Sequence, residues 1–554
     1  MKSRTKLMVI LTTLGTGISS AALAEQLECS QQTTARLGVS DVQIDVVESI
    51  AAGGEVAVGH CRLAGITGAH RGMDGNDYAI GFELRLPDDW NGRFVHQFNG
   101  GNDGAVVSAV GPLLGGDDSD TALSRGYAVV SSNAGHRGDA HPDAGLAGGA
   151  RFGFDAQARR DYGYQAVATL NPLAEAMVEA YYDAPIEYSY GVGGSNGGRH
   201  AMVAASRLPD AFDGLLAGYP GFNLPKAAIQ HAWDVQAFKA VTGDVRTAFS
   251  RDDLDRVARN ILAQCDNLDG LTDNWVADVD ACQQKYNPDW LQCSPGQTQG
   301  CLSAAQVTAL KTVHRGPHNS AGEALYSDWA WDSGIGSGDW RFWKLESPIP
   351  PWGNNSLIAV MGSSSLAQLF TTPPTRVAGS PQALEAYLLA FDFDRDAPLI
   401  NNSTAQFPES AMDFMTPPGA ENPELADFRD AGGKLIVFHG VSDPVFSVRD
   451  TTRWYQKLDA NNGANAAAFA RYYRVPGMPH GAGGPAPDDF DVFSVLVDWV
   501  EHGREPGAVT ASVSDANEAG QAMLGDVSRL LCPYPQVARY GSGEPHRASS
   551  FSCR

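Results

Sequence analysis

The chain has 554 residues, of which 64 are Asp or Glu and 40 are Lys or Arg, so its formal net charge is −24. A surface this acidic repels nucleic acids and anionic membranes, and we expect neither as a partner. A chain of this length exceeds what one hydrophobic core usually holds, which predicts either one large domain with an insertion or two domains.

The N-terminal segment has the features of an export signal. Lys2, Arg4 and Lys6 precede an apolar stretch, and a small-residue sequence follows that ends at Ala24. The apolar stretch is shorter than the ~20 residues that a membrane-spanning helix needs, and no later stretch is long enough. We therefore expect residues 1–24 to be a signal peptide and the mature protein to be secreted or periplasmic.

Short apolar runs alternate with helical patterns over much of the chain, which is typical of a mostly parallel sheet covered on both faces. Between residues 222 and 415 this alternation gives way to Trp, Pro, Gly, Ser and clustered Cys. The predicted strands are 81–86, 93–97, 128–131, 187–191, 434–439 and 471–475. The sequence thus predicts an α/β fold with residues 222–415 inserted as a lid.

Residues 193–197 read Gly-Gly-Ser-Asn-Gly, a G-x-S-x-G pattern between a predicted strand and a predicted helix. Glycines at these positions allow the tight turn that holds a serine hydroxyl clear of a sheet. The pattern alone is common in a chain with 61 glycines, but its place between strand and helix makes it specific. It predicts Ser195 as the nucleophile of an α/β-hydrolase fold, with residues 25–221 and 416–554 as the catalytic domain.

Serine attack on an ester carbonyl produces an oxyanion, which needs preorganised hydrogen-bond donors. The backbone N–H of Asn196, at the start of the predicted helix, is one candidate. The second is expected from the loop 98–104, which reads Phe-Asn-Gly-Gly-Asn-Asp-Gly. Gly101 is our choice there and Gly100 the alternative, while an ordinary turn is the competing interpretation of this loop.

The acid is expected after the nucleophile and before the histidine in the chain order of this fold. Asp443 follows the predicted strand 434–439, at the place where the fold carries its acid. Asp450 is a competitor, but it falls in the following helix. We therefore predict Asp443.

The base is expected after the last predicted strand, where His480 lies in a glycine-rich loop. His439 precedes the acid, and His200 lies along the helix after the nucleophile, so both are weaker candidates. In the predicted mechanism His480 takes the proton of Ser195, Asp443 orients the imidazole, and an acyl-enzyme forms and is hydrolysed.

The cysteines are even in number, which in an exported protein argues for disulfides. They are Cys29, Cys61, Cys265, Cys282, Cys293, Cys301, Cys532 and Cys553. Their clustering suggests four local pairs in this order along the chain, although the sequence does not fix the connectivity.

An acidic loop contains Asp266, Asp269 and Asp273 close together. Carboxylates this near repel one another unless a cation lies between them, and oxygen ligands suit calcium. The spacing is not that of an EF-hand, so a solvated acidic loop is an equally good interpretation of these residues alone.

Together these motifs resemble the tannase and feruloyl esterase family, which includes the mono(hydroxyethyl) terephthalate hydrolases. The resemblance spans the mature chain and rests on residues 60–62, 99–101, 193–199, 265–275, 439–443, 476–484 and 531–535. It implies hydrolysis of carboxylic esters of aromatic or phenolic acids, with no organic cofactor. It also implies a structural calcium held by the side chains of Asp266, Asp269 and Asp273 and the carbonyls of Leu271 and Trp275.

The chain departs from the family at two positions. The family usually bonds a cysteine directly before the nucleophile to one directly after the catalytic histidine, and here these positions are Gly194 and Gly481. We infer that the bond was lost as a unit, so that packing and hydrogen bonds hold the His480 loop. Replacing both glycines with cysteine is predicted to crosslink the two loops.

The substrate is the least determined property. The tryptophans of the insertion could enclose an aromatic ring or form its core, and none is assigned to the site; they include Trp329, Trp331, Trp340, Trp343 and Trp352. The alternatives are a general short-chain esterase, a mono(hydroxyethyl) terephthalate-type hydrolase and, from another class, a calcium-stabilised binding protein without catalysis.

Overall fold

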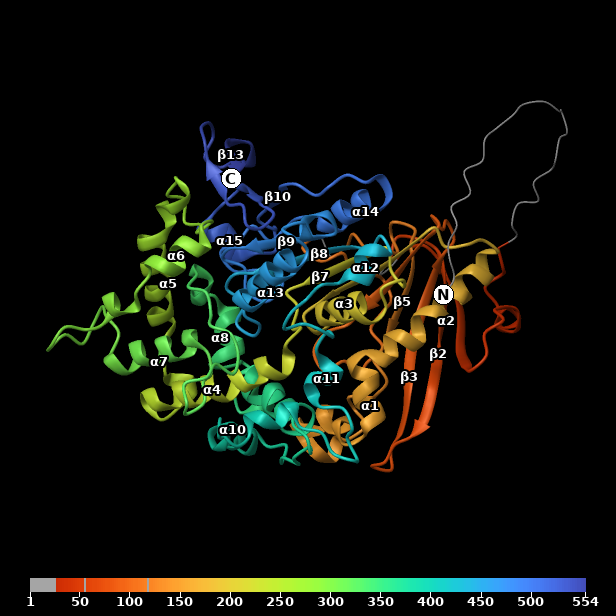
Figure 1. Cartoon of the computed structure of the whole chain (residues 1–554), viewed down its shortest axis with the longest axis horizontal. Coiled ribbons are helices and arrows are strands. Elements are labelled where there is room, and N and C mark those ends of the chain that lie inside the picture. Colours follow the sequence, from red (N-terminus) through yellow and green to blue (C-terminus); the bar gives the residue numbers. More distant parts are fainter. Residues whose placement is uncertain (1–25, 54–55, 117–118) are drawn as a thin grey trace.

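A nine-stranded mixed sheet runs through the part of the chain that carries the predicted nucleophile, in the order β1-β2-β3-β5-β4-β6-β7-β8-β9 (Figure 1). The computed structural model describes residues 26–53, 56–116 and 119–554, so the predicted signal peptide and its cleavage site lie outside the described residues. The strands are β1 (Val42–Ile50), β2 (His60–Arg71), β3 (Asp77–Pro87), β4 (Arg93–Phe98), β5 (Ala128–Ser132), β6 (Tyr188–Gly194), β7 (Gly214–Gly218), β8 (Lys434–Gly440) and β9 (Ala470–Val475).

The sheet changes character along its width. The pairs β1–β2, β2–β3 and β3–β5 are antiparallel, whereas the pairs β5–β4, β4–β6, β6–β7, β7–β8 and β8–β9 are parallel. All six predicted strands are present, but β1, β2 and β7 were not predicted. In an open sheet of this kind, ligands bind beyond the carboxyl ends of the parallel strands. That edge is therefore where the site is expected.

Helices cover both faces of the parallel strands because successive side chains of a strand point to opposite sides. On β7, Leu215 and Ala217 pack in one hydrophobic cluster with residues of α3 (Asn196–Arg207) and α13 (Val448–Asn461), and Leu216 packs in another with residues of α14 (Val492–His502). The remaining helices of this part are α1 (Ala156–Arg160), α2 (Ala166–Tyr182) and α12 (Ala426–Asp430). The sheet and its helices form the α/β-hydrolase fold that the sequence predicted.

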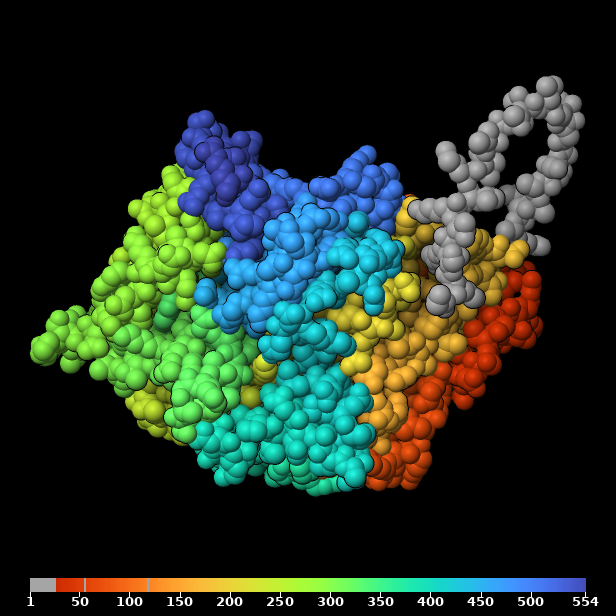
Figure 2. Space-filling model, viewed as in Figure 1, coloured from red at the N-terminus to blue at the C-terminus, as the bar shows by residue number. Residues whose placement is uncertain are grey.

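Between β7 and β8 the chain leaves the sheet, and the described residues of this stretch add no strand to it. In Figure 2 this stretch, coloured yellow-green to cyan, occupies the left and lower part of the visible face. It contains α4 (Leu224–Thr242), α5 (Arg251–Cys265), α6 (Val279–Lys285), α7 (Ala304–Arg315), α8 (Gly338–Lys344), α9 (Ser363–Gln368), α10 (Pro381–Ala390) and α11 (Ala411–Met415). Its core is continuous with that of the sheet, since Phe238 and Trp340 belong to the same cluster as Phe94 and Val130. The division into a catalytic and a lid domain stays a prediction.

Four disulfides staple segments that are close in sequence. They join Cys29 to Cys61, Cys265 to Cys282, Cys293 to Cys301 and Cys532 to Cys553, the pairs that the clustering suggested, and no described cysteine is free. The last one ties together the C-terminal segment, which contains β10 (Val509–Ser512), α15 (Glu518–Met523), β11 (Ser528–Leu531), β12 (Ala538–Tyr540) and β13 (Phe551–Cys553). Across the described residues, no helix has both the length and the apolar character to cross a bilayer.

Candidate active site

Ser195 lies on a sharp turn between β6 and α3, at the carboxyl edge of the parallel strands. Its φ of 62° and ψ of −124° are disfavoured for a residue with a side chain, and such strain is common at functional sites. A Cβ atom at Gly197 would lie 2.4 Å from the carbonyl oxygen of Phe98, and one at Gly193 would lie 2.6 Å from the backbone of Gly197. The glycines of the G-x-S-x-G pattern are thus required by close backbone approach.

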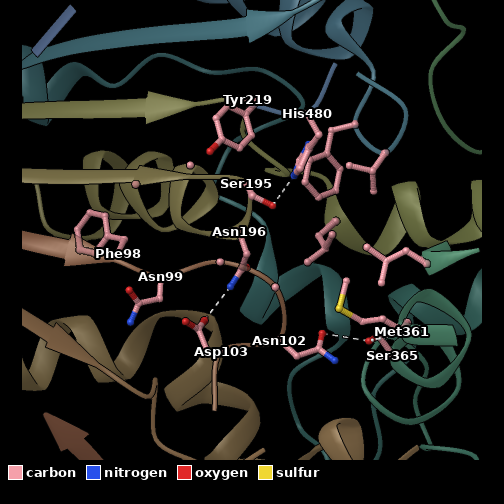
Figure 3. Close-up of a pocket in the computed structure, with 18 of the residues that line it drawn as sticks. Phe98, Asn99, Asn102, Asp103, Ser195, Asn196, Tyr219, Met361, Ser365 and His480 are labelled. Atoms are coloured by element: carbon pink, nitrogen blue, oxygen red, sulfur yellow. Dashed lines mark hydrogen bonds between the residues drawn. The ribbon is translucent and has the colours of Figure 1, made fainter. Parts of the chain in front are cut away.

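The structure brings Ser195, His480 and Asp443 together in one chain of hydrogen bonds (Figure 3). The Ser195 Oγ lies 2.9 Å from His480 Nε2, and His480 Nδ1 lies 2.8 Å from Asp443 Oδ2. A carboxylate only accepts hydrogen bonds, so Nδ1 carries the proton and Nε2 is free to accept from the serine hydroxyl. This is the tautomer that a general base needs.

Asp443 is buried, yet four N–H groups surround its carboxylate. Besides His480, the backbone N–H groups of Val445 and Phe446 donate to Oδ1 at 2.8 and 3.0 Å, and His439 Nε2 lies 3.2 Å from Oδ2. Burial alone would raise the pKa of Asp443, but the two histidines and their hydrogen bonds outweigh it and hold the pKa well below the usual range. The environment of Asp443 thus favours the ionised carboxylate.

The competing residues occupy other positions. His439 lies behind the acid, where Nε2 also faces the carbonyl oxygen of Phe446 and Nδ1 lies 2.9 Å from Thr451 Oγ1. Asp450 lies in α13 and accepts a hydrogen bond from Asn223 at 2.9 Å, away from His480. His439 is a supporting residue that sequence reasoning treated only as a rival base.

The predicted oxyanion donors lie on the other side of Ser195. Asn196 is the first residue of α3, where backbone N–H groups have no partner within the helix and the helix dipole favours negative charge. Gly100 approaches Ser195 closely, since a Cβ atom there would lie 3.7 Å from Ser195 Cβ, whereas one at Gly101 would meet open space. The Gly101 carbonyl accepts a hydrogen bond from Tyr162 Oη at 3.1 Å, which fixes the orientation of this peptide.

A buried polar cluster that the sequence did not indicate lies beneath this loop. Asp103 Oδ2 accepts a hydrogen bond from Asn196 Nδ2 at 2.8 Å and lies 3.2 Å from His200 Nε2. Burial raises the pKa of Asp103 to about 7, against the lowering effect of His136, Arg199 and Asn196. His200, the other rival base, is thus part of this support and is separated from the serine hydroxyl by Asn196.

A cavity of about 570 Å³ opens in front of Ser195 and His480. The insertion and the sheet edge both contribute apolar side chains to it, among them Leu224, Trp343, Leu357, Ile358, Met361, Phe370, Val445 and Phe446. Of the described residues that line it, none is lysine or arginine. Trp343 also packs edge-on against His480, with ring centroids 4.8 Å apart, whereas Trp329, Trp331 and Trp340 are buried in the insertion and do not line the cavity.

The acidic loop follows α5, and some of its carboxylate oxygens accept hydrogen bonds from the backbone of the same loop. Asp266 accepts hydrogen bonds from the N–H groups of Asp273, Asn274 and Trp275 at 3.0, 2.9 and 3.3 Å, and Asp273 Oδ2 pairs with Arg529 at 2.6 Å. Across the described residues, no three His, Cys, Asp or Glu side chains are grouped so that they could hold a metal by themselves.

Two oxygens of this loop are buried without a hydrogen-bond partner, namely Asp269 Oδ2 and Asp273 Oδ1. Burial, together with the neighbouring Asp273 and Asp266, raises the pKa of Asp269 to about 7 against the lowering effect of two backbone hydrogen bonds. Buried carboxylate oxygens without hydrogen-bond partners, on carboxyls whose pKa is raised, are expected where a loop binds a cation. These two oxygens are compatible with a cation bound beside Asp269 and Asp273.

Comparison with known proteins gives a match over nearly the whole chain. The family model described as tannase and feruloyl esterase matches residues 61–554. A mono(2-hydroxyethyl) terephthalate hydrolase of Piscinibacter sakaiensis is 39% identical over 519 residues, which cover 89% of this chain and 84% of that protein. A probable feruloyl esterase of Arthroderma benhamiae is 28% identical, covering 88% of this chain and 84% of its own.

Solved structures agree on the fold. Feruloyl esterase B from Aspergillus oryzae superimposes with a TM-score of 0.75 at 21% identity, covering 94% of this chain and 98% of that one. A tannin acyl hydrolase from Aspergillus niger gives a TM-score of 0.66 at 21% identity, covering 95% of each chain. Both likenesses therefore include the insertion as well as the sheet.

Proposed function

The chain belongs to the tannase and feruloyl esterase family and is a carboxylic ester hydrolase, and from this premise we propose that it cleaves uncharged esters of aromatic or phenolic acids. The nucleophile in this proposal is Ser195, with His480 as base and Asp443 as the acid that orients it. The observation that carries the proposal is the hydrogen-bond chain from Ser195 Oγ through His480 to Asp443, which lies at an apolar cavity.

In the proposed mechanism Ser195 Oγ attacks the ester carbonyl carbon while His480 Nε2 takes its proton. The N–H groups of Asn196 and Gly101 donate to the oxyanion of the tetrahedral intermediate. His480 then returns the proton to the leaving alcohol, which departs and leaves an acyl-enzyme. A water molecule, deprotonated by His480, releases the acid and restores the serine.

The cavity supports an uncharged aromatic acyl group. Flat apolar side chains such as Trp343 and Phe446 can enclose a ring, and the volume of about 570 Å³ lies in the range of small-molecule sites. A carboxylate placed in this cavity would have no lysine or arginine beside it among the described lining residues. An unpaired buried charge costs several kcal/mol, so we expect neutral esters to be preferred over anionic ones.

The second candidate is hydrolysis of mono(2-hydroxyethyl) terephthalate, whose acyl ring carries a carboxylate. The 39% identity with the Piscinibacter sakaiensis hydrolase favours it. The two candidates differ in one measurable quantity, the ratio of kcat/KM for a neutral aromatic ester to that for its anionic analogue.

The test is a panel of p-nitrophenyl acetate, methyl ferulate, methyl gallate and mono(2-hydroxyethyl) terephthalate. We expect the highest kcat/KM on a neutral aromatic ester and a loss of at least about 10³-fold in kcat for Ser195→Ala. Ser206→Ala is the matched control, because that hydroxyl lies in the same helix α3 and, among the described residues, bonds only the Met202 carbonyl. Preference for p-nitrophenyl acetate alone would indicate a short-chain esterase, and activity that survives in Ser195→Ala would refute the triad.

We also propose that a calcium ion stabilises the acidic loop through Asp266, Asp269 and Asp273 and the carbonyls of Leu271 and Trp275. The unpaired oxygens of Asp269 and Asp273 support this. Bound calcium would supply positive charge that holds the loop, without a part in the chemical step. A ligand present at 100 times its Kd stabilises the folded state by about 2.7 kcal/mol, so chelation is expected to lower Tm by several degrees and calcium to restore it.

Asp269→Asn is expected to remove the calcium-dependent part of Tm, and magnesium is the ion control because it accepts such irregular sites poorly. A Tm that is the same with chelator and with calcium would refute the metal.

Export is proposed on the N-terminal segment alone. A signal peptide over residues 1–24 would place the mature enzyme outside the cytoplasm, in agreement with its disulfides. N-terminal sequencing of the protein recovered from the medium or the periplasm tests cleavage after Ala24.

A further inference from the structure

Tyr219 lies between the turn that carries the nucleophile and the loop that carries the histidine. It directly follows β7, and its backbone N–H donates to the carbonyl of Phe438 on β8 at 2.6 Å. Its φ of 35° is positive, a conformation that is uncommon for a residue with a bulky side chain. Such strain persists only where the surroundings hold a residue in place, and it is most frequent at functional sites.

The phenol ring fills the space between Gly194 and Gly481. A Cβ atom at Gly194 would lie 2.2 Å from Tyr219 Oη and 2.4 Å from Cζ, and one at Gly481 would lie 2.7 Å from the same Cζ. The two glycines are thus in contact with one ring from two sides. Neither position can carry a side chain while the ring stays where it is.

These distances also set an upper limit on the separation between the Cβ positions at Gly194 and Gly481. Two Cβ positions that lie 2.4 and 2.7 Å from one atom are at most 5.1 Å apart, the sum of the two distances. Disulfides join Cβ atoms about 3.5–4.5 Å apart. The gap between Gly194 and Gly481 therefore has the size of a disulfide, and in this chain an aromatic ring occupies it.

The same ring packs against the imidazole. The centroids of Tyr219 and His480 are 4.8 Å apart with the rings at 72°, the edge-on arrangement that aromatic pairs favour. Trp343 and Phe446 pack against the other sides of His480 at 4.8 and 5.5 Å. Burial raises the pKa of Tyr219 to about 12, with a further contribution from Asp443, so the phenol is neutral when the enzyme works.

We propose that Tyr219 is a positioning residue that replaces a covalent link between the nucleophile turn and the histidine loop, holding His480 at hydrogen-bond distance from Ser195. The proposal rests on the function proposed above for Ser195 and His480. It changes the expectation drawn from the sequence, because a cysteine pair at Gly194 and Gly481 would collide with the ring. The two loops should crosslink only after the ring is removed.

The first test is kinetic. Tyr219→Ala removes the ring and should lower kcat about 10²-fold on a neutral ester, since displacement of a catalytic group by about 1 Å costs that much, while KM changes by a few-fold. Tyr219→Phe keeps the ring and should retain most of kcat, because the hydroxyl has no hydrogen bond within the described residues. Wild-type kcat in Tyr219→Ala, or equal losses in both variants, would overturn the positioning role.

The second test counts thiols and does not depend on activity. The native cysteines are all paired, so any free thiol belongs to an introduced residue. After oxidation, Gly194→Cys/Gly481→Cys should keep two free thiols, and Gly194→Cys/Tyr219→Ala/Gly481→Cys should keep none. Both variants carry the same backbone strain at Gly481, whose φ is 96°, so the comparison isolates the ring.

Oxidation of the triple variant should also raise its kcat above that of its reduced form. Equal crosslinking with and without Tyr219, or a crosslink that leaves kcat unchanged, would refute the proposal that Tyr219 replaces a covalent link between the two loops. Failure of the proposed function is recognised separately, by activity that survives in Ser195→Ala. The thiol counts keep their meaning in that case.

Discussion

Two buried carboxyl groups flank Ser195, and the structure gives them opposite character. Asp443, on the histidine side, is surrounded by four N–H donors and its pKa lies well below the usual range. Asp103, on the oxyanion side, is reached in the described part of the chain by Asn196 and His200, both at Oδ2, and burial raises its pKa to about 7. Figure 3 shows Asp103 and His480 on opposite sides of the nucleophile.

The difference suits the proposed mechanism. In that mechanism a fixed negative charge on the histidine side would stabilise the imidazolium that forms when the serine loses its proton. On the oxyanion side a second negative charge would oppose the developing oxyanion. With its pKa raised to about 7, Asp103 is mostly protonated below neutral pH and there supports Asn196 without adding a full charge. Burial raises the pKa of both carboxyls, and the number of N–H groups that donate to each decides whether the pKa ends below or above the usual range.

The largest expected effect comes from removing the charge of Asp443. Asp443→Asn is expected to lower kcat by about 10³–10⁴-fold with little change in KM, because an amide no longer fixes the imidazole tautomer. Steady-state kinetics on a neutral aromatic ester measure this, with circular dichroism as a check on folding. Asp450→Asn is the matched control, since that side chain bonds Asn223 away from His480. Equal losses in the two variants would assign Asp443 a structural role only.

Asp103 predicts a pH dependence of stability. A carboxyl whose folded pKa is raised contributes stability below its unfolded pKa, near 4, and loses it as pH rises through about 7. Between pH 5.5 and 8.5 the free energy of unfolding of the wild type should therefore fall by about 2 kcal/mol relative to Asp103→Asn, at 1.4 kcal/mol per pKa unit over the interval up to 7.

Denaturant midpoints of the two proteins at each pH measure this difference. Asp161, whose pKa burial raises to about 6, titrates in both proteins and cancels. A constant difference across the pH range would show that Asp103 is ionised throughout.

The residues of the site that could be predicted share one property, a turn that follows an apolar strand. Ser195, Asp443 and His480 all follow strands in this way, and chain order then separates acid from base. The cysteine pairs could be predicted for a similar reason, because each disulfide joins cysteines that are close in sequence. Such features depend on a few residues that are close in sequence.

The residues that escaped prediction depend on contacts between distant segments. β7 reads Gly-Leu-Leu-Ala-Gly, which lacks β-branched and aromatic residues, so Tyr219 at its end had no recognisable strand before it. The raised pKa of Asp103 needs α3 and the loop after β4 packed together. The role of His439 becomes visible only when its ring is seen behind Asp443, although its position four residues before the acid was a usable signal.

The smallest expected effect tests how many donors Asp443 needs. His439→Phe removes one N–H group from the carboxylate, so the pKa of Asp443 should rise toward the usual range and kcat should fall about 10-fold, since one hydrogen bond to a charged group contributes about 1.5 kcal/mol. Steady-state kinetics on a neutral aromatic ester measure this loss. Thr451→Val, which only removes the hydroxyl 2.9 Å from His439 Nδ1, should give a smaller loss of kcat. A graded series would show that the support of Asp443 is built from separate hydrogen bonds, whereas unchanged kcat in both variants would mean that the two backbone N–H groups and His480 suffice.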